Sequence, residues 1–71
     1  MIASDIRPGW VMRRKDTGEL LYTVAAVARV PVFNPELGAV LEYVRAECLH
    51  ADGVTRPHFW LPGDTVHFNK P

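Results

Sequence analysis

The chain has 71 residues, 48% of them hydrophobic and 23% charged, which is the composition of one small globular domain and excludes a disordered segment. Its eight basic and eight acidic residues cancel, so it lacks the basic excess of a dedicated nucleic-acid binder, and its one cysteine excludes an internal disulfide or a cysteine-rich zinc site. Without a signal-peptide pattern or an apolar run long enough for a bilayer, we expect a cytoplasmic protein that stays off the membrane.

Prolines and glycines occur often along the chain, which favours short strands over long helices. We expect a turn at residues 7–9 and a first strand at residues 10–15. A polar connection follows at residues 15–19, where Gly18 is placed for a positive φ angle. The opening of the chain therefore predicts the start of a β-hairpin.

The stretch at residues 20–30 is rich in β-branched and aromatic side chains, so it predicts a long second strand. Pro31 is expected to end or bend this strand, because proline cannot donate a backbone hydrogen bond to a neighbouring strand. Residues 31–38 then form a loop in which Asn34-Pro35 supplies the turn.

Two interpretations compete for the next stretch. A helix over about residues 35–49 would have Asn34 as its N-cap and Pro35 as its first residue, and it would make the fold α+β. Gly38 near the start of that helix costs about 1 kcal/mol relative to alanine. A strand over residues 39–50 is favoured, because it also explains the alternation that follows the next turn.

Asp52-Gly53 is the preferred pair for a two-residue hairpin turn, whose central positions both need positive φ. That turn would place Glu47 opposite His58. The register separates an almost wholly apolar face from a mostly polar one, as a half-buried hairpin requires. The apolar face would collect Val44, Ala46, Cys48, Pro57, Phe59 and Leu61, and the other face Arg45, Glu47, Leu49, Arg56, His58 and Trp60.

The end of the chain predicts an edge strand and a closing strand. Pro57 fits a strand only where its nitrogen is directed away from a partner, which marks an edge. After a turn at residues 61–64, residues 65–69 alternate, with two apolar side chains inward and His67 outward. Five short strands in a chain of this length predict one all-β domain over residues 1–71, a small SH3-like barrel.

Parts of the sequence resemble the small bacterial YodC-like proteins. The stretch PGWVMRRKDTGELLYTV is similar to the first hairpin of that family, and VRAECLHADG with FWLPGDTV resembles its later strand, turn and closing strand. The sequence departs from the pattern at Trp10, at Arg14 and in the longer loop at residues 31–38. The resemblance implies a small SH3-like barrel and no established activity. The matching positions in the first hairpin are Gly9, Val11, Lys15, Gly18, Thr23 and Val24.

The predicted fold is also similar to that of the plasmid-borne type II dihydrofolate reductases, which are small SH3-like barrels that act as tetramers. Their pore carries a Val-Gln-Ile-Tyr stretch, which this sequence lacks, so their activity is not carried over. The similarity leaves one alternative open, an oligomeric enzyme whose site forms at a symmetry axis.

No set of residues predicts a catalytic, metal or cofactor site. His50, His58 and His67 lie on different predicted strands or turns without metal-ligand spacing, so we interpret them as solvated side chains. Cys48 is expected to point inward, whereas a catalytic thiol needs an exposed, electropositive surrounding. The sequence therefore favours a protein that is not an enzyme.

The outward face of the predicted hairpin is the candidate binding surface, because an exposed tryptophan beside arginine is typical of a binding hot spot. In the expected register Trp60 stands opposite Arg45. The same pair would also be an ordinary cation–π contact on a sheet face. The candidate binding residues are Trp60, Arg45, His58, Arg56, Glu47 and Leu49, and the candidate nucleic-acid contacts are Arg13, Arg14 and Lys15.

The leading hypothesis is a non-catalytic protein-interaction module that uses one sheet face or edge, of the kind that phages and mobile elements often encode. Its protein partner is of unknown identity. Weak nucleic-acid binding through basic residues 13–15 is one alternative, and an oligomeric enzyme is another. Self-association is a further alternative, because a homodimer would bury Leu49 and Trp60.

Overall fold

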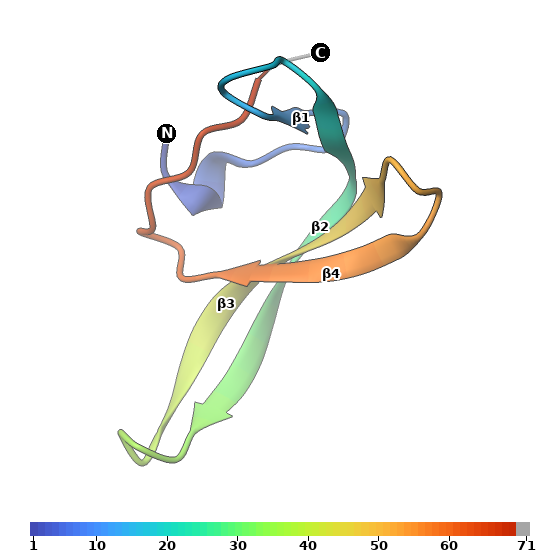
Figure 1. Cartoon of the computed structure of the whole chain (residues 1–71). Coiled ribbons are helices and arrows are strands. Elements are labelled where there is room, and N and C mark those ends of the chain that lie inside the picture. Colours follow the sequence, from blue (N-terminus) through green and yellow to red (C-terminus); the bar gives the residue numbers. More distant parts are fainter. Residues whose placement is uncertain (70–71) are drawn as a thin grey trace.

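The computed structural model describes residues 1–69 and shows an all-β fold, as the sequence predicts. Its strands form one antiparallel sheet in the order β1-β2-β3-β4 (Figure 1). Within residues 1–69, no helix has the length and apolar character needed to cross a membrane. The elements are a short 3-10 helix η1 (Ala3–Asp5) and the strands β1 (Val11–Arg13), β2 (Leu20–Asn34), β3 (Ala39–His50) and β4 (Thr55–Trp60).

The alternative helix over residues 35–49 does not form, and β3 spans the residues of the favoured interpretation. Alternate side chains in the second half of β3 are buried, and this period of two fits a strand and not a helix. The turn before β3 is closed by Asn34, whose side-chain oxygen accepts hydrogen bonds from the N–H groups of Glu36 and Leu37 at 3.0 and 3.2 Å.

β2 is longer than the sequence predicts, because it runs through Pro31 to Asn34. The backbone bond from the N–H of His50 to the carbonyl of Val54 shows that the N–H of His50 is directed toward β4. The N–H groups of successive β3 residues alternate between β4 and β2, and the pairing of β3 with β2 extends this alternation to β2. It directs the Pro31 nitrogen toward the free edge of β2, where no hydrogen bond is lost. The expected loop at residues 31–38 is therefore wrong in its first half.

The β3–β4 hairpin has a different register from the predicted one. Residues 51–53 form a three-residue loop, flanked by the bonded pair of His50 and Val54. Gly53 has a φ of +84° but Asp52 does not have a positive φ, and the expected two-residue turn needs positive φ at both. The Asp52 carboxylate instead accepts a hydrogen bond from the N–H of Val54 at 3.0 Å. Each residue of β4 therefore lies one position away from its predicted partner.

A one-residue change of register turns every side chain of β4 to the opposite face. Arg45 lies opposite Phe59 and not Trp60. Glu47 lies opposite Pro57. We call the face that carries the core the inner face and the opposite one the outer face. On β3 and β4 the inner face carries Val44, Ala46, Cys48, Arg56, His58 and Trp60, and the outer face carries Arg45, Glu47, Leu49, Pro57 and Phe59.

Residues 65–69 do not form the predicted fifth strand of the sheet. They run beside the N-terminal part of the chain and meet β1 through one isolated bridge, between Val11 and Asn69. Val66 is buried and His67 is exposed, so the predicted alternation of this segment is right. In the described part of the chain the sheet stays open and does not close into a five-stranded barrel.

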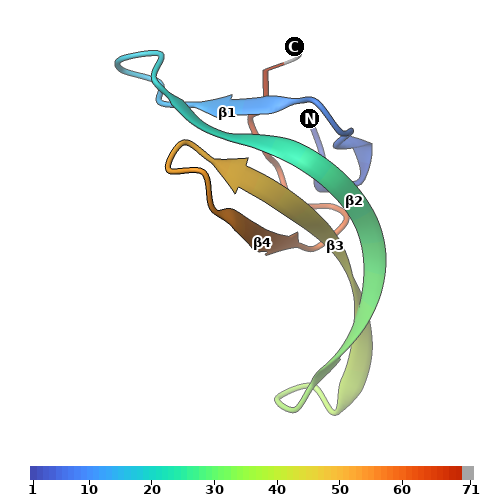
Figure 2. The same cartoon turned by 90° about the vertical axis from the view of Figure 1, so that its right-hand side faces the viewer.

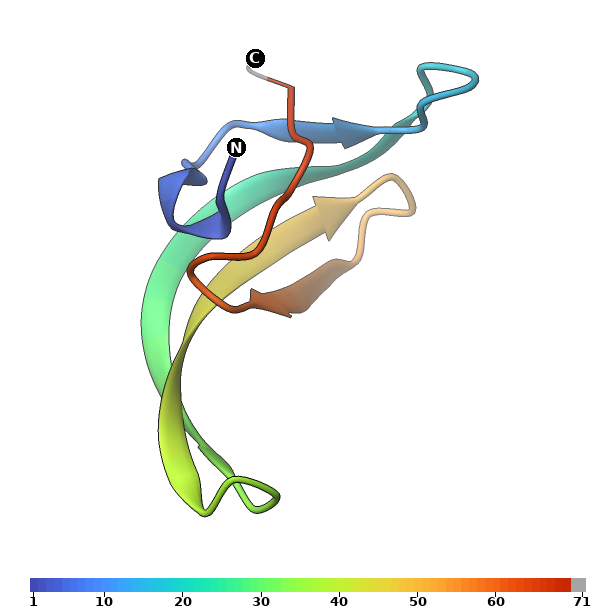
Figure 3. The same cartoon turned by 90° about the vertical axis from the view of Figure 1, so that its left-hand side faces the viewer.

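The core lies between the inner face and the two terminal segments, which cross over that face (Figure 3). Cys48 is fully buried, in agreement with the expectation that its thiol points inward. The two terminal segments are bonded to each other, since the N–H of Ala3 donates to the carbonyl of Asp64 at 2.8 Å. The buried core consists of Ala3, Ile6, Tyr22, Val24, Val44, Ala46, Cys48 and Val66.

One half of the β2–β3 hairpin extends away from this core (Figure 2). β3 pairs with β4 only over residues 44–49, and β2 pairs with β1 only over residues 20–23. Residues 30–43 therefore form a two-stranded ribbon, which we call the arm. The molecule measures 41 × 24 × 19 Å, and the arm accounts for its elongated shape.

Candidate functional site

The structure divides the predicted binding residues between two faces, so the predicted patch of tryptophan beside arginine does not exist. Arg56 lies at the start of β4, where its guanidinium bonds to the carboxylate of Asp52 at 2.7 Å. The register of β4 separates the other residues. The inner face has Trp60 and His58, and the outer face has Arg45, Glu47 and Leu49.

A group of aromatic rings packs along the inner face. The ring centroid of Tyr22 lies 4.6 Å from that of His58 and 5.0 Å from that of His50. Phe68, from the C-terminal segment, meets Tyr22 at 6.0 Å and Trp60 at 5.8 Å, edge to face in both cases. Trp60 therefore helps to hold the C-terminal segment against the sheet and is not available to a partner.

His50 and His58 point at each other, with their Nε2 atoms 2.9 Å apart. The ring centroids are 5.1 Å apart and the planes are inclined by 18°, so the two nitrogens meet end to end. In this geometry one neutral imidazole donates its N–H to the bare nitrogen of the other. A tetrahedral zinc ion bound by both nitrogens would hold them about 3.3 Å apart. The interpretation of His50 and His58 as solvated side chains is wrong for this pair, because both are half-buried and contact each other.

The inner-face cluster favours neutral side chains. Burial lowers the pKa of His58, and the cationic groups that His50 and Arg56 can present nearby lower it further. Burial also raises the pKa of Tyr22 to about 12. These directions are those of groups that belong to a core, because taking a charge out of water is unfavourable.

On the outer face, Arg45 and Glu47 neutralise each other. They are two residues apart on β3, and a guanidinium nitrogen of Arg45 lies 2.6 Å from a carboxylate oxygen of Glu47. The guanidinium also lies 5.8 Å from the ring centroid of Phe59. This is an ordinary cation–π contact, made with a different aromatic residue from the predicted Trp60.

The outer face also carries a row of apolar and aromatic side chains that the sequence interpretation missed. Val32, Tyr43 and Phe59 line a shallow hollow of about 210 Å³ where the arm joins the sheet. Phe59 is 48% exposed, although it is large and apolar. The pairing places on this face Leu21, Val30, Val32, Leu41, Tyr43, Leu49 and Phe59.

A second hollow, of about 130 Å³, lies on the same face beside Arg45 and Glu47. Ala26 and Ala28 line it with small side chains, next to the irregularity in the β2–β3 pairing between residues 24 and 26. The side chains of a partner can enter these two hollows on the apolar face.

The sequence does contain a signal for the outer face. Val30 and Val32 have the period of two of a strand that is apolar on one face, and Leu41 and Tyr43 repeat it on the neighbouring strand. The interpretation of residues 31–38 as a loop removed Val32 from the sheet. The predicted register also turned Phe59 toward the core.

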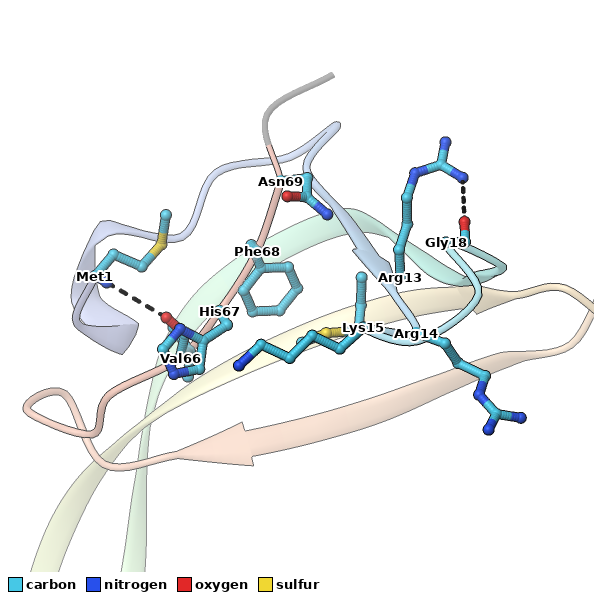
Figure 4. A pocket seen from close by; sticks show the side chains of 10 residues that line it. Met1, Arg13, Arg14, Lys15, Gly18, Val66, His67, Phe68 and Asn69 are labelled. Carbon is cyan, nitrogen blue, oxygen red and sulfur yellow. Dashed lines mark hydrogen bonds between the residues drawn. The ribbon is translucent and has the colours of Figure 1, made fainter.

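The candidate nucleic-acid residues line a hollow of about 590 Å³ near β1 and the C-terminal segment (Figure 4). Arg13 donates to the carbonyl of Gly18 at 3.1 Å. Arg14 bonds to both carboxylate oxygens of Asp16, at 3.2 and 3.0 Å. In Figure 4 Lys15 reaches across the hollow, whereas Arg13 and Arg14 point away from it. The three basic residues therefore share a hollow without converging on one point.

The described residues contain no group of three or more His, Cys, Asp or Glu side chains that could hold a metal ion. Burial, together with the nearby Glu47 carboxylate, raises the pKa of the Cys48 thiol to about 11. Such a thiol is protonated at neutral pH and is a poor nucleophile. The features that stand out in residues 1–69 are surfaces for contact.

Comparison with models of known protein families, with curated proteins and with solved structures finds no match to this chain. Its function therefore has to be inferred from the surfaces described above.

Proposed function

We propose that the protein is a non-catalytic interaction module that binds a protein partner through the outer face of its sheet. The observation that carries this proposal is the uncovered apolar row, with Phe59 half-exposed beside a hollow. Large contiguous apolar patches are rare on monomeric soluble proteins, and they mark interaction sites. A single free cysteine suits the reducing cytoplasm, where we place this activity.

Three of the residues predicted for binding belong to this surface. Arg45 and Leu49 contribute large side chains to the surface, and Glu47 neutralises the charge of Arg45. Val32 and Phe59 extend the surface onto the arm and β4. An aromatic residue with an adjacent arginine is the composition of an interface centre, because both residue types are enriched among the residues that contribute most to binding.

Photo-crosslinking in cells tests this proposal. One variant carries p-benzoylphenylalanine in place of Phe59 on the outer face, and a matched variant carries it in place of the exposed His67. We expect protein adducts at position 59, with another protein or with a second copy of this chain, and none at position 67. Adducts at neither position, or only at position 67, would argue against an outer-face site.

Weak nucleic-acid binding is a second candidate, and the hollow lined by Arg13, Arg14 and Lys15 is the observation in its favour. The zero net charge and the bonds that engage both arginines predict few phosphate contacts and a shallow salt dependence. Titration with single- and double-stranded DNA and RNA at low salt tests it, with Lys15→Gln as the weakened variant. No binding by the wild type removes this candidate.

We also propose that the fold is an open relative of the SH3-like barrel, as the resemblance to YodC-like proteins implies. Support comes from the strongly curved sheet and from the bridge between Val11 and Asn69, which lies where a fifth strand would close a barrel. An experimental structure in which residues 65–69 pair along β1 would support this relation. Separation of these residues from β1 would contradict it.

A further inference from the structure

The arm needs a covering surface whenever the chain is folded. A two-stranded ribbon without further packing is at best marginally stable in water. The arm (residues 30–43) pairs with no other strand in the described part of the chain, and on its outer face Val32 is 40% exposed. A second copy of the chain is a partner that is always present with it.

The charge of the outer face suits a copy of itself. A two-fold dimer places the same surface patch on both sides of the interface, so any unpaired charge near the axis would meet its own like charge. On β2, β3 and β4 the charged residues of this face are Arg45 and Glu47, and they are paired with each other. The face is therefore neutral as well as apolar, and it has no excess charge to recruit a strongly acidic or basic partner.

Two prolines favour packing through the face over addition of a strand at an edge. Pro31 lies on the free edge of β2, and Pro57 lies on the free edge of β4. The alternation set by the bond between His50 and Val54 directs both proline nitrogens outward. A strand added at either edge would meet a position without an N–H donor, which is a known protection against edge pairing.

The outline of the molecule sets an upper limit on the area of a dimer interface. The 41 × 24 Å outline of the molecule bounds its broad face at roughly 1,000 Å², and a stable interface takes about 800 Å² from each partner. Two antiparallel sheets pack face to face at about 10 Å when apolar side chains interdigitate. The hollow of about 210 Å³ at Val32, Tyr43 and Phe59 gives the partner side chains a place to enter.

We propose that the occupant of the outer face is a second copy of this chain, so that the protein is a homodimer of two sheets packed outer face to outer face. This inference rests on the proposed function, since it names the partner for the same surface. The dimer buries the apolar row and the base of each arm.

Sedimentation velocity of the purified full chain, from about 1 μM to about 500 μM, tests the inference. The wild type is expected to sediment with twice the 8.0 kDa mass of the chain. A Val32→Thr, Phe59→Thr variant should raise the dissociation constant at least tenfold. Phe33→Thr is the matched control, because Phe33 lies on the same arm, is more exposed than either residue, and faces the other side. Circular dichroism checks that each variant is folded.

A wild type that remains at 8.0 kDa over the whole range would overturn the inference. Equal weakening by Phe33→Thr and by the outer-face variant would overturn it too, because association would then not be specific to the outer face. The crosslinking experiment separates the two proposals. A monomer that still forms adducts with another protein at position 59 loses the dimer and keeps the proposed function, whereas a monomer without adducts loses both.

Discussion

The inner and outer faces of the sheet are built from the same strands and differ in what covers them. On the inner face, Ala46 and Cys48 are fully buried beneath the terminal segments. On the outer face, Val32 and Phe59 are 40% and 48% exposed. Side chains of similar character are thus part of the core on one side and in contact with solvent on the other.

Apolar character alone therefore does not decide which way a short edge strand faces. β4 carries aromatic side chains at consecutive positions, Phe59 outward and Trp60 inward. Either register would therefore give the core an aromatic side chain. The loop decides between them, because Gly53 takes a positive φ and Asp52 does not, which gives a loop of three residues.

The largest contrast between the faces is expected when their aromatic side chains are truncated. Trp60→Ala removes a ring that packs against His58 and Phe68, and we expect it to lower the free energy of unfolding by about 2–4 kcal/mol. Phe59→Ala removes a half-exposed ring and should cost less than about 1 kcal/mol at protein concentrations that keep the chain monomeric. Urea denaturation measures both, and equal costs would be incompatible with the two faces as assigned.

A smaller loss of stability is expected from a substitution in the loop that sets the register. Gly53→Ala places a side chain at a φ of +84° and should cost about 1–2 kcal/mol, although the space around the added Cβ is open. Gly63→Ala is the matched control, because its Cβ also meets open space and its φ is not positive, so its effect should stay within about 0.5 kcal/mol. Thermal denaturation compares them. A neutral Gly53→Ala would mean that the loop does not depend on the left-handed conformation.

Acid should weaken the inner face through His58. Its pKa in the folded protein lies below the ordinary value of 6.5, so the unfolded chain takes up the proton first as the pH falls. The contribution to stability is therefore complete above about pH 6.5 and is lost as the pH falls toward the folded pKa. We expect the melting temperature to drop on acidification, with a smaller drop in His58→Gln.

His67→Gln is the control for this pH dependence, because His67 is exposed and outside the cluster. It should keep the drop of the wild type. The same drop in all three proteins would show that His58 is not the group that responds.

The smallest effect on stability is expected at the outer-face ion pair. Glu47→Lys breaks a partly exposed pair with Arg45 and should cost less than about 1 kcal/mol. It also leaves unbalanced positive charge on a face that meets its own copy, so self-association should weaken about tenfold or more. Adding Arg45→Glu to the same chain restores neutrality and should restore the dimer. Sedimentation equilibrium measures the dissociation constant of each variant. A dissociation constant that stays unchanged in both variants would place the interface elsewhere.

The class of fold and most strand positions could be predicted because the evidence for them is local. The alternation in β3 is a property of consecutive residues, and so is the turn closed by Asn34. The full length of β2 was not predictable in this way. Pro31 is tolerated because, within the described residues, no strand lies beside that part of β2, and the position of an edge is a property of the whole sheet.

The candidate site was less predictable than the fold, because a face is defined only once the register is known. Arg45, Glu47 and Leu49 were assigned to the outward face correctly, since the buried alternation of β3 is clear from the sequence. Trp60 and Phe59 were exchanged, since one extra residue in the loop reverses β4. The hollow at the base of the arm could not be predicted from the sequence, because it forms only when three strands pair.

The assignment of both faces rests on the register of β4, and nuclear Overhauser effects between Hα atoms measure that register directly. In antiparallel strands these effects are strongest in the pairs without backbone hydrogen bonds, whose Cα atoms are about 4.5 Å apart. The structure predicts a strong cross-peak between Arg45 and Phe59, which places the phenyl ring on the outer face. A strong cross-peak between Ala46 and Phe59 in its place would put that ring in the core and contradict the account.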